Sequence, residues 1–259
     1  MKAINSQFVF LVSLILLQSC AVHRPPQPDE LVIRVNAESC IHHGERLENG
    51  AIPSPAQIAK DAYCARLLMD REAPNGIITI FGSSRTQEDQ TAYINTRTFA
   101  REWTTLYGSK YPILTGGGGG IMEAGNRGAF EANGPSLAFS SYFRSVDSEN
   151  LNQYITAGYI ASSFAQREAD MVDYAVAVVV APGGVGTEWE IFETLAKIQT
   201  RKKDPVPVLL LGKRAVWQTL LDRLNYLNEI KTISPEDLEL FHVVETPEAA
   251  IAVLKEALN

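Results

Sequence analysis

Short apolar runs alternate with longer amphipathic stretches along most of the chain. The apolar runs predict strands at 76–81, 111–114, 136–139, 174–180, 206–211 and 241–244. The amphipathic stretches predict helices at 55–71, 88–107, 121–133, 163–173, 188–200 and 214–228, with a last helix that begins at Thr246-Pro247. Continuous apolar runs are typical of parallel strands that are buried on both faces. The alternation therefore predicts an α/β protein built on a single, doubly wound parallel sheet.

The N-terminus carries the pattern of an export signal. Residues 8–17 form an apolar run behind a short polar start that contains Lys2. This run is too short to cross a bilayer as a helix and fits the core of a signal peptide. The sequence LQSC that follows resembles the bacterial lipobox, in which Cys20 becomes the lipidated first residue. An uncleaved anchor and a simple secretory signal are the alternatives.

These features predict a signal peptide over 1–19, a lipid-attachment cysteine with a Pro-rich tether over 20–52, and one folded domain over 53–259. Ala21 stands where an acidic residue would favour retention in the inner membrane. We therefore expect a lipid-anchored protein of the cell envelope, held in the outer membrane and facing the periplasm. In that oxidising space Cys40 and Cys64 either form a disulfide or remain two separate thiols.

The net charge of the chain limits the classes of partner that it can bind. The net charge is −7 over 259 residues, and an acidic surface disfavours a nucleic-acid polymer, because phosphate backbones bind clustered Lys and Arg. A mononucleotide remains compatible, since a few backbone N–H groups at a helix N-terminus can hold its phosphate.

Three loops rich in small residues follow predicted strands. They are FGSSR at 81–85, TGGGGG at 115–120 and PGGVGT at 182–187. In a doubly wound sheet the carboxyl ends of the strands share one edge, and ligands bind there. Each loop opens onto a helix, whose unpaired N–H groups attract anions, and glycines allow close approach to the backbone. The loops together predict a site for a phosphorylated ligand.

Several familiar site motifs are absent from the chain. It lacks GxxxxGK[ST], which rules out a P-loop, and GxGxxG, which removes the dinucleotide fingerprint. GxSxG is also missing, which weakens a serine hydrolase interpretation. The four histidines lack metal-ligand spacing, so we expect no metal site. The chemistry proposed below needs neither flavin nor nicotinamide, so we expect no cofactor.

The segment PGGVGTEWE at 182–190, with TGGGGGIMEAGNRGA at 115–129 and FGSSR at 81–85, resembles the LOG family over about 76–230. The resemblance implies a Rossmann-like fold, a homodimer and nucleotide 5′-monophosphate phosphoribohydrolase activity. It implies that Arg167 and Glu190 are catalytic and that Glu149 contacts the nucleotide. Two positions depart from the family pattern: Glu168 stands where a lysine usually follows the arginine, and Gly119 replaces a proline.

The predicted substrate-binding residues lie in the three loops and the helix starts that follow them. They are Ser83, Ser84, Arg85, Gly117, Gly118, Glu123, Glu149, Gly183, Gly184, Val185, Gly186 and Thr187.

Several of these residues have simpler structural explanations. Thr187 and Glu190 have the spacing of a capping box, and one of the two serines after the first strand could be a helix N-cap. Glu123 could either stabilise the positive end of a helix dipole or contact the ribose of the nucleotide. Trp189 and Phe192 are expected in the core rather than stacked on a base.

Two functions remain open from the sequence. The first is hydrolysis of the N-glycosidic bond of AMP or N6-modified AMP, in which a carboxylate faces the cationic ribose of the transition state. The second is a lipid-anchored nucleotide or cofactor carrier without turnover, as in relatives that carry molybdenum cofactor.

The lipobox-like segment generates the first prediction. Mass spectrometry of the protein purified from membranes should show a diacylated or triacylated N-terminus at Cys20. A Cys20→Ser variant should keep its signal segment and lack the lipid. A mature protein that begins elsewhere, or that is soluble in the periplasm, would contradict the prediction.

Overall fold

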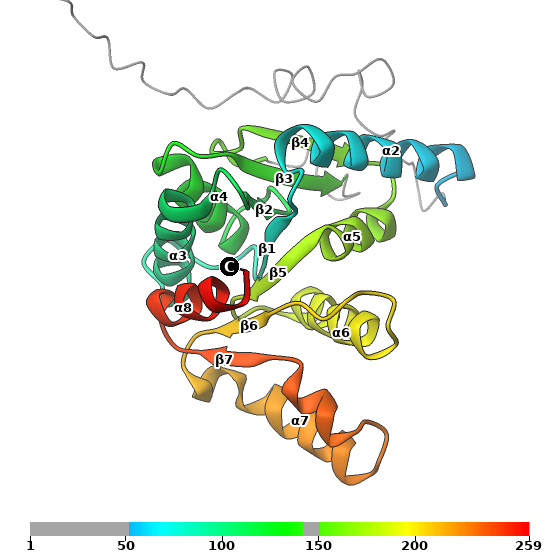
Figure 1. The fold of residues 1–259 in the computed structure, drawn as a ribbon, viewed down its shortest axis with the longest axis vertical. Helices are drawn as coiled ribbons and strands as arrows, with labels where there is room; N and C mark the ends of the chain where they lie inside the picture. The colour runs from blue at the N-terminus through cyan, green and yellow to red at the C-terminus, as the bar shows by residue number, and fades with distance from the viewer. Residues whose placement is uncertain (1–51, 142–150, 259) are drawn as a thin grey trace, which may run out of the picture.

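In a computed structural model that describes residues 52–141 and 151–258, the chain folds around one seven-stranded sheet (Figure 1). Every neighbouring pair of strands is parallel, in the order β4-β3-β2-β1-β5-β6-β7. The strands are β1 (Ile77–Phe81), β2 (Ile113–Thr115), β3 (Ser136–Ser141), β4 (Ala157–Ala161), β5 (Ala175–Val180), β6 (Val208–Leu211) and β7 (His242–Val244). The predicted α/β fold with a doubly wound sheet is confirmed.

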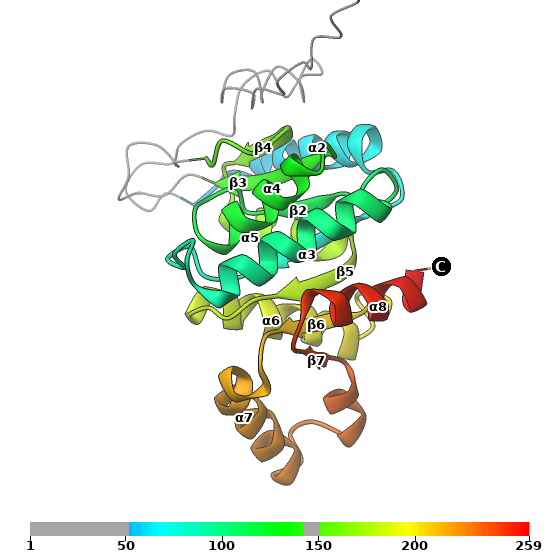
Figure 2. The same ribbon diagram turned by 90° about the vertical axis from the view of Figure 1, so that its left-hand side faces the viewer.

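Helices cover both faces of this sheet (Figures 1 and 2). On one face lie α3 (Thr91–Tyr107), α4 (Ile121–Glu131) and α8 (Pro247–Leu258). On the other lie α2 (Pro55–Glu72), α5 (Phe164–Asp173), α6 (Val185–Gln199) and α7 (Gln218–Glu229), with 3-10 turns η1 (Arg214–Trp217) and η2 (Pro235–Glu239) at the ends of α7. Strand β5 lies beside β1, although residues 82–174 separate them in sequence.

The two faces of the sheet bury two large apolar clusters. Leu68, Met171 and Leu195 belong to the cluster under α2, α5 and α6. Phe99 and Trp103 of α3 belong to the other cluster, where their rings stack at 6.4 Å between centroids. The strands between them are buried on both sides, which explains why they read as continuous apolar runs.

Two predictions about the elements were wrong. Strand β4 was not predicted, because three of the five residues in its sequence AGYIA are Ala or Gly, which have low β propensity. It is nevertheless paired along its whole length with β3. Helix α6 was expected to begin near residue 188, but it begins at Val185 with Gly184 as N-cap.

Helix α2 begins as predicted, with Ser54 as N-cap and Pro55 at the first position. The Ser54 hydroxyl and the side chain of Gln57 form a capping box there. Cys64 in this helix is fully buried and disulfide-bonded. The other two cysteines, Cys20 and Cys40, lie outside the described residues.

A buried carboxylate ties α2 to the start of α5. Asp61 is 1% exposed and accepts hydrogen bonds from the Tyr159 hydroxyl at 2.8 Å and from the backbone N–H groups of Ser162 and Ser163 at 3.1 and 2.8 Å. Ser163 is the N-cap of α5. Asp61 therefore holds in place the turn from which the next helix projects.

No helix within residues 52–141 and 151–258 combines the length and the apolar character that crossing a membrane requires.

The Asp61 contacts predict a large stability effect. Asp61→Ala removes the carboxylate that accepts from two backbone donors and from a buried hydroxyl, so it should lower the free energy of unfolding by about 2–4 kcal/mol. The control is Asp70→Ala on the same helix, whose exposed ion pair with Arg66 should be worth less than about 0.5 kcal/mol. Denaturant unfolding measures both. Equal losses would show that Asp61 does not have this role.

Candidate functional site

The loops after β1, β2 and β5 meet at the carboxyl edge of the sheet and enclose a cavity of about 900 Å³. Strands β1 and β5 are neighbours, yet the chain leaves β1 toward α3 on one face and β5 toward α6 on the other. This is the switch point at which doubly wound sheets bind ligands. The cavity is lined by Ile80, Phe81, Gly82, Ser83, Ser84, Arg85, Gly116, Gly118, Gly119, Met122, Phe164, Arg167, Glu168, Gly184, Val185, Gly186, Thr187 and Glu190.

The glycine loop after β2 is held by packing against the loop after β1. The Ile121 N–H donates to the carbonyl oxygen of Ser83 at 2.9 Å. Gly120 has a φ of 64°, and a Cβ there would lie 2.3 Å from the same oxygen. Only glycine fits this position. Gly119 is different, since the nearest atom to an added Cβ is 3.5 Å away, so its departure from proline changes little.

The N-terminus of α6 presents bare backbone to the cavity. A Cβ added at Gly184 or Gly186 would meet nothing within 4 Å. The first N–H groups of a helix have no carbonyl partner within it and carry the positive end of the helix dipole. Gly183 precedes these groups, and a Cβ added to it would lie 2.0 Å from the Thr187 hydroxyl oxygen. The absence of a side chain at Gly183 therefore leaves room for this hydroxyl. This terminus is built to receive an anion.

Arg167 projects from the first turns of α5 into the same space and is only 7% exposed. Its Nε donates to the carbonyl oxygen of Phe139 at 2.9 Å, and its Nη1 forms an ion pair with Glu168. A Cβ on Gly116 would lie 2.1 Å from Nη2. The guanidinium is therefore held between the end of β3, the glycine loop and its own helix.

Glu190 lines the cavity from the second turn of α6. Burial raises the pKa of its carboxyl group to about 7, a change that the positive charge of Arg167 opposes and the negative charge of Glu193 increases. A cavity-lining carboxylate whose pKa is near neutrality, facing a buried guanidinium, is a candidate for acid–base or electrostatic chemistry.

Comparison with protein families bears on these residues. A family model described as "Possible lysine decarboxylase" matches residues 122–254, which is more than half of the chain and includes Arg167 and Glu190. The chain belongs to this family. It is the LOG family that the glycine motifs indicated.

Solved structures show the same fold as this LOG-family chain. The molybdenum cofactor binding protein from the phototrophic bacterium Rippkaea orientalis is similar with a TM-score of 0.54 and 21% identity, over 71% of this chain and 98% of that one. The molybdenum cofactor carrier protein of Chlamydomonas reinhardtii has a TM-score of 0.52 and 21% identity, with the same coverage. No curated protein matches the sequence. At this identity the likeness shows the fold alone.

The family description names a decarboxylase, and the cavity can be compared with that chemistry. Amino-acid decarboxylation with pyridoxal phosphate requires a lysine that forms a Schiff base with the cofactor. None of the described residues that line the cavity is a lysine. The residues present do not fit that cofactor.

The structure brings most of the predicted LOG-type site residues to the cavity. Those that line it are Ser83, Ser84, Arg85, Gly118, Arg167, Gly184, Val185, Gly186, Thr187 and Glu190. Gly117 and Gly183 stand behind the lining, and Glu149 lies outside the described residues. Glu123 does not line the cavity either, because its carboxylate accepts a hydrogen bond from the Tyr93 hydroxyl at 2.8 Å. Glu123 lies in the first turn of α4, as the helix-dipole explanation expects, and its ribose contact stays a prediction.

Both capping explanations for site residues were wrong. Thr187 is the third residue of α6 rather than its N-cap, so Glu190 is not part of a capping box. Helix α3 begins at Thr91 with Gln90 as N-cap, so neither serine after β1 caps it. The Ser83 hydroxyl instead accepts a hydrogen bond from the Arg85 N–H at 3.1 Å. These corrections leave Glu190 without a role in starting its helix.

The sequence analysis did not predict one aromatic residue of the cavity, Phe164, and it wrongly expected Trp189 to be buried in the core. Phe164, the first residue of α5, lines the cavity, and its ring lies 5.5 Å from that of Trp189. Trp189 was expected in the core but is 42% exposed. Phe192 packs against the core as expected. The sequence signal that could have indicated Phe164 is its position directly after Ser163, the N-cap of α5.

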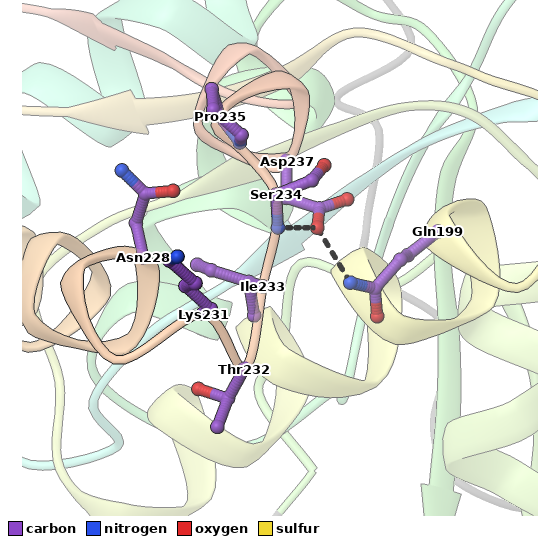
Figure 3. A pocket seen from close by; sticks show the side chains of 8 residues that line it. All are labelled: Gln199, Asn228, Lys231, Thr232, Ile233, Ser234, Pro235 and Asp237. Atoms are coloured by element: carbon purple, nitrogen blue, oxygen red, sulfur yellow. Dashed lines mark hydrogen bonds between the residues drawn. The ribbon is translucent and has the colours of Figure 1, made fainter.

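A second cavity of about 670 Å³ lies between the end of α6 and the α7–η2 connection (Figure 3). These segments lead into the amino ends of β6 and β7, at the edge of the sheet opposite the glycine loops. Its carboxylate, Asp237, accepts hydrogen bonds from the Ser234 N–H and from Gln199, each at 2.7 Å. Because the Asp237 carboxylate already caps η2, we assign no ligand to this cavity.

The electrostatics of Glu190 can be measured directly. Arg167→Met should raise the pKa of Glu190 above about 7, because it removes an attraction, and Glu193→Gln should lower it, because it removes a repulsion. Carbon-13 NMR titration of the carboxyl groups measures both shifts. Glu188→Gln, on an exposed position of the same helix, is the control. A fall in the pKa of Glu190 in Arg167→Met, or a rise in Glu193→Gln, would contradict the described positions of these charges.

The same pKa predicts a pH dependence of stability. The usual pKa of the group is 4.5 and its folded-state pKa is about 7, so between these values the folded state binds more protons than the unfolded state. The free energy of unfolding should therefore fall as pH rises through this window. Burial also raises the pKa of Asp170 to about 6, and it acts in the same direction. Glu190→Gln should remove its own part of the decrease.

Proposed function

We propose that this LOG-family chain hydrolyses the N-glycosidic bond of a purine nucleoside 5′-monophosphate, AMP or N6-modified AMP, to the free base and ribose 5-phosphate. The observation that carries the proposal is the convergence of three groups on one cavity. These are the buried guanidinium of Arg167, the carboxyl group of Glu190, and the anion-binding N-terminus of α6.

The phosphate is placed at the Gly184–Thr187 backbone in this proposal. Several N–H groups there are free of helix partners, and hydrogen bonds to an anion are stronger than neutral ones. The phosphate does not react. It serves to fix the ribose, and its binding energy orients the reacting bond.

Glu190 lies about one helical turn beyond this terminus, where it can face C1′ of the ribose. Cleavage of the C1′–N bond builds positive charge on the sugar, and an ionised carboxylate stabilises that charge. The bond electrons leave with the base, which takes up a proton from solvent. Water adds its oxygen to C1′ and gives a proton to Glu190, which then releases that proton to solvent. Arg167 lowers the pKa of Glu190, which favours the ionised carboxylate, and binds ribose hydroxyls or the departing base.

A second function is supported by the fold comparison. Similar structures belong to proteins described as a binder and a carrier of molybdenum cofactor. The same cavity in this chain would then hold a nucleotide or a cofactor without turnover. The presence of both Arg167 and Glu190 favours the hydrolase.

Incubation of the purified protein with AMP, with adenine release followed by chromatography, tests the proposal. We expect adenine and ribose 5-phosphate in equal amounts, and no release from adenosine, which lacks the phosphate. Tight AMP binding by calorimetry with no adenine release would favour the carrier. Equal affinity for AMP and adenosine would contradict the phosphate position.

Glu190→Gln is the sharpest variant for the proposed chemistry. Because Gln keeps the shape and loses the charge, kcat should fall by about 10²-fold or more, while AMP affinity and melting temperature change little. Glu193→Gln, a carboxylate on the same helix that does not line the cavity, should keep most of the turnover. In wild type, kcat/KM should rise with pH through about 7 as Glu190 of the free protein ionises. Normal turnover in Glu190→Gln would overturn the mechanism.

A further inference from the structure

Glu168 is a charged residue of the cavity that the proposed chemistry does not use. Its side chain is 1% exposed and lines the cavity beside Arg167. One carboxylate oxygen, Oε1, forms the ion pair with the Arg167 guanidinium. The other, Oε2, is buried and has no hydrogen-bond partner among the described residues.

A buried carboxylate oxygen without a donor is costly and therefore rare in folded proteins. The structure offers Oε2 no donor, yet the residue lies at a cavity wall where a bound molecule can supply one. The other carboxylate of the cavity, Glu190, is also an acceptor when ionised. Oε2 of Glu168 therefore favours groups that donate hydrogen bonds over the oxygens of a phosphate dianion, which only accept them.

We propose that Oε2 of Glu168 accepts a hydrogen bond from a donor group of the bound nucleotide, so that Glu168 determines specificity. This rests on the proposed function. The donor is either a ribose hydroxyl or the amino group of the base, since these are the groups of AMP that donate. With the phosphate at the α6 terminus, Glu168 fixes which way the remainder of the nucleotide points.

Calorimetry with a matched ligand series tests this and separates the two donors. The protein carries Glu190→Gln, so that ligands stay intact. The ligands are AMP, 2′-deoxy-AMP, 3′-deoxy-AMP, and purine riboside 5′-monophosphate, which lacks the 6-amino group. We expect AMP to bind at least about tenfold more tightly than the one analogue that lacks the donor to Glu168.

Adding Glu168→Gln keeps one oxygen to accept from Arg167 and puts an NH2 donor in the place of Oε2, at nearly constant shape. AMP should then bind at least about tenfold more weakly, and the preference for AMP over that one analogue should fall to near one. If the variant no longer prefers AMP over one of the deoxy ligands, the donor to Glu168 is that ribose hydroxyl. If it no longer prefers AMP over purine riboside 5′-monophosphate, the donor is the 6-amino group of the base. Glu168→Asp, which withdraws the carboxylate by one methylene, should weaken the same preference and serves if the Gln variant does not fold.

The control is Asp173→Asn, which removes a negative charge from the same helix outside the cavity and should leave all four affinities unchanged. Equal weakening of all four ligands in Glu168→Gln would show that Glu168 acts only through Arg167 and would overturn the inference. Unchanged affinities would overturn it as well. If the parent protein binds none of the ligands, the proposed function fails, and the inference fails with it.

Discussion

The site depends on one buried guanidinium. Arg167 is held by the Phe139 carbonyl oxygen at the end of β3 and by Glu168 on α5, and it packs against the bare backbone of Gly116 after β2. Burying such a charge is unfavourable unless it is paired and hydrogen-bonded, so these contacts are a condition for the fold as well as for the site. The position of α5 matters for the same reason. Asp61 fixes the turn before it, and with it the direction in which Arg167 projects.

Around this cation the cavity sorts ligands by charge. The N-terminus of α6 offers backbone donors at one side, whereas Glu168 and Glu190 offer acceptors beside Arg167. An anionic group is attracted to the former and repelled by the latter. A ligand with a phosphate at one end and hydroxyl or amino groups at the other satisfies both sides. A nucleoside monophosphate has this pattern.

The sequence was sufficient for six of the seven strands and for the loops that line the cavity, because glycine loops and buried apolar runs are local signals. It was insufficient where tertiary contacts decide. Strand β4 has a weak local preference and exists because β3 pairs with it. The start of α6 at Val185 follows from extended glycines that no capping residue marks. Glu168 was visible only as a departure from a family pattern, and its unpaired oxygen is a property of packing. Phe164 was missed for the same reason.

Whether such a cavity hydrolyses its ligand or only binds it depends on the charge of Glu190 in the complex. A phosphate dianion bound nearby repels the carboxylate and raises the pKa of Glu190 further above its value of about 7 in the free protein. A neutral Glu190 would hold a nucleotide without stabilising a cationic ribose. Arg167 opposes this rise, since its buried charge is screened little by water. The helix dipole of α6 shields the phosphate from the carboxylate at the same time. We propose that the balance between Arg167 and a bound phosphate decides whether a chain of this fold hydrolyses the nucleotide or only carries it.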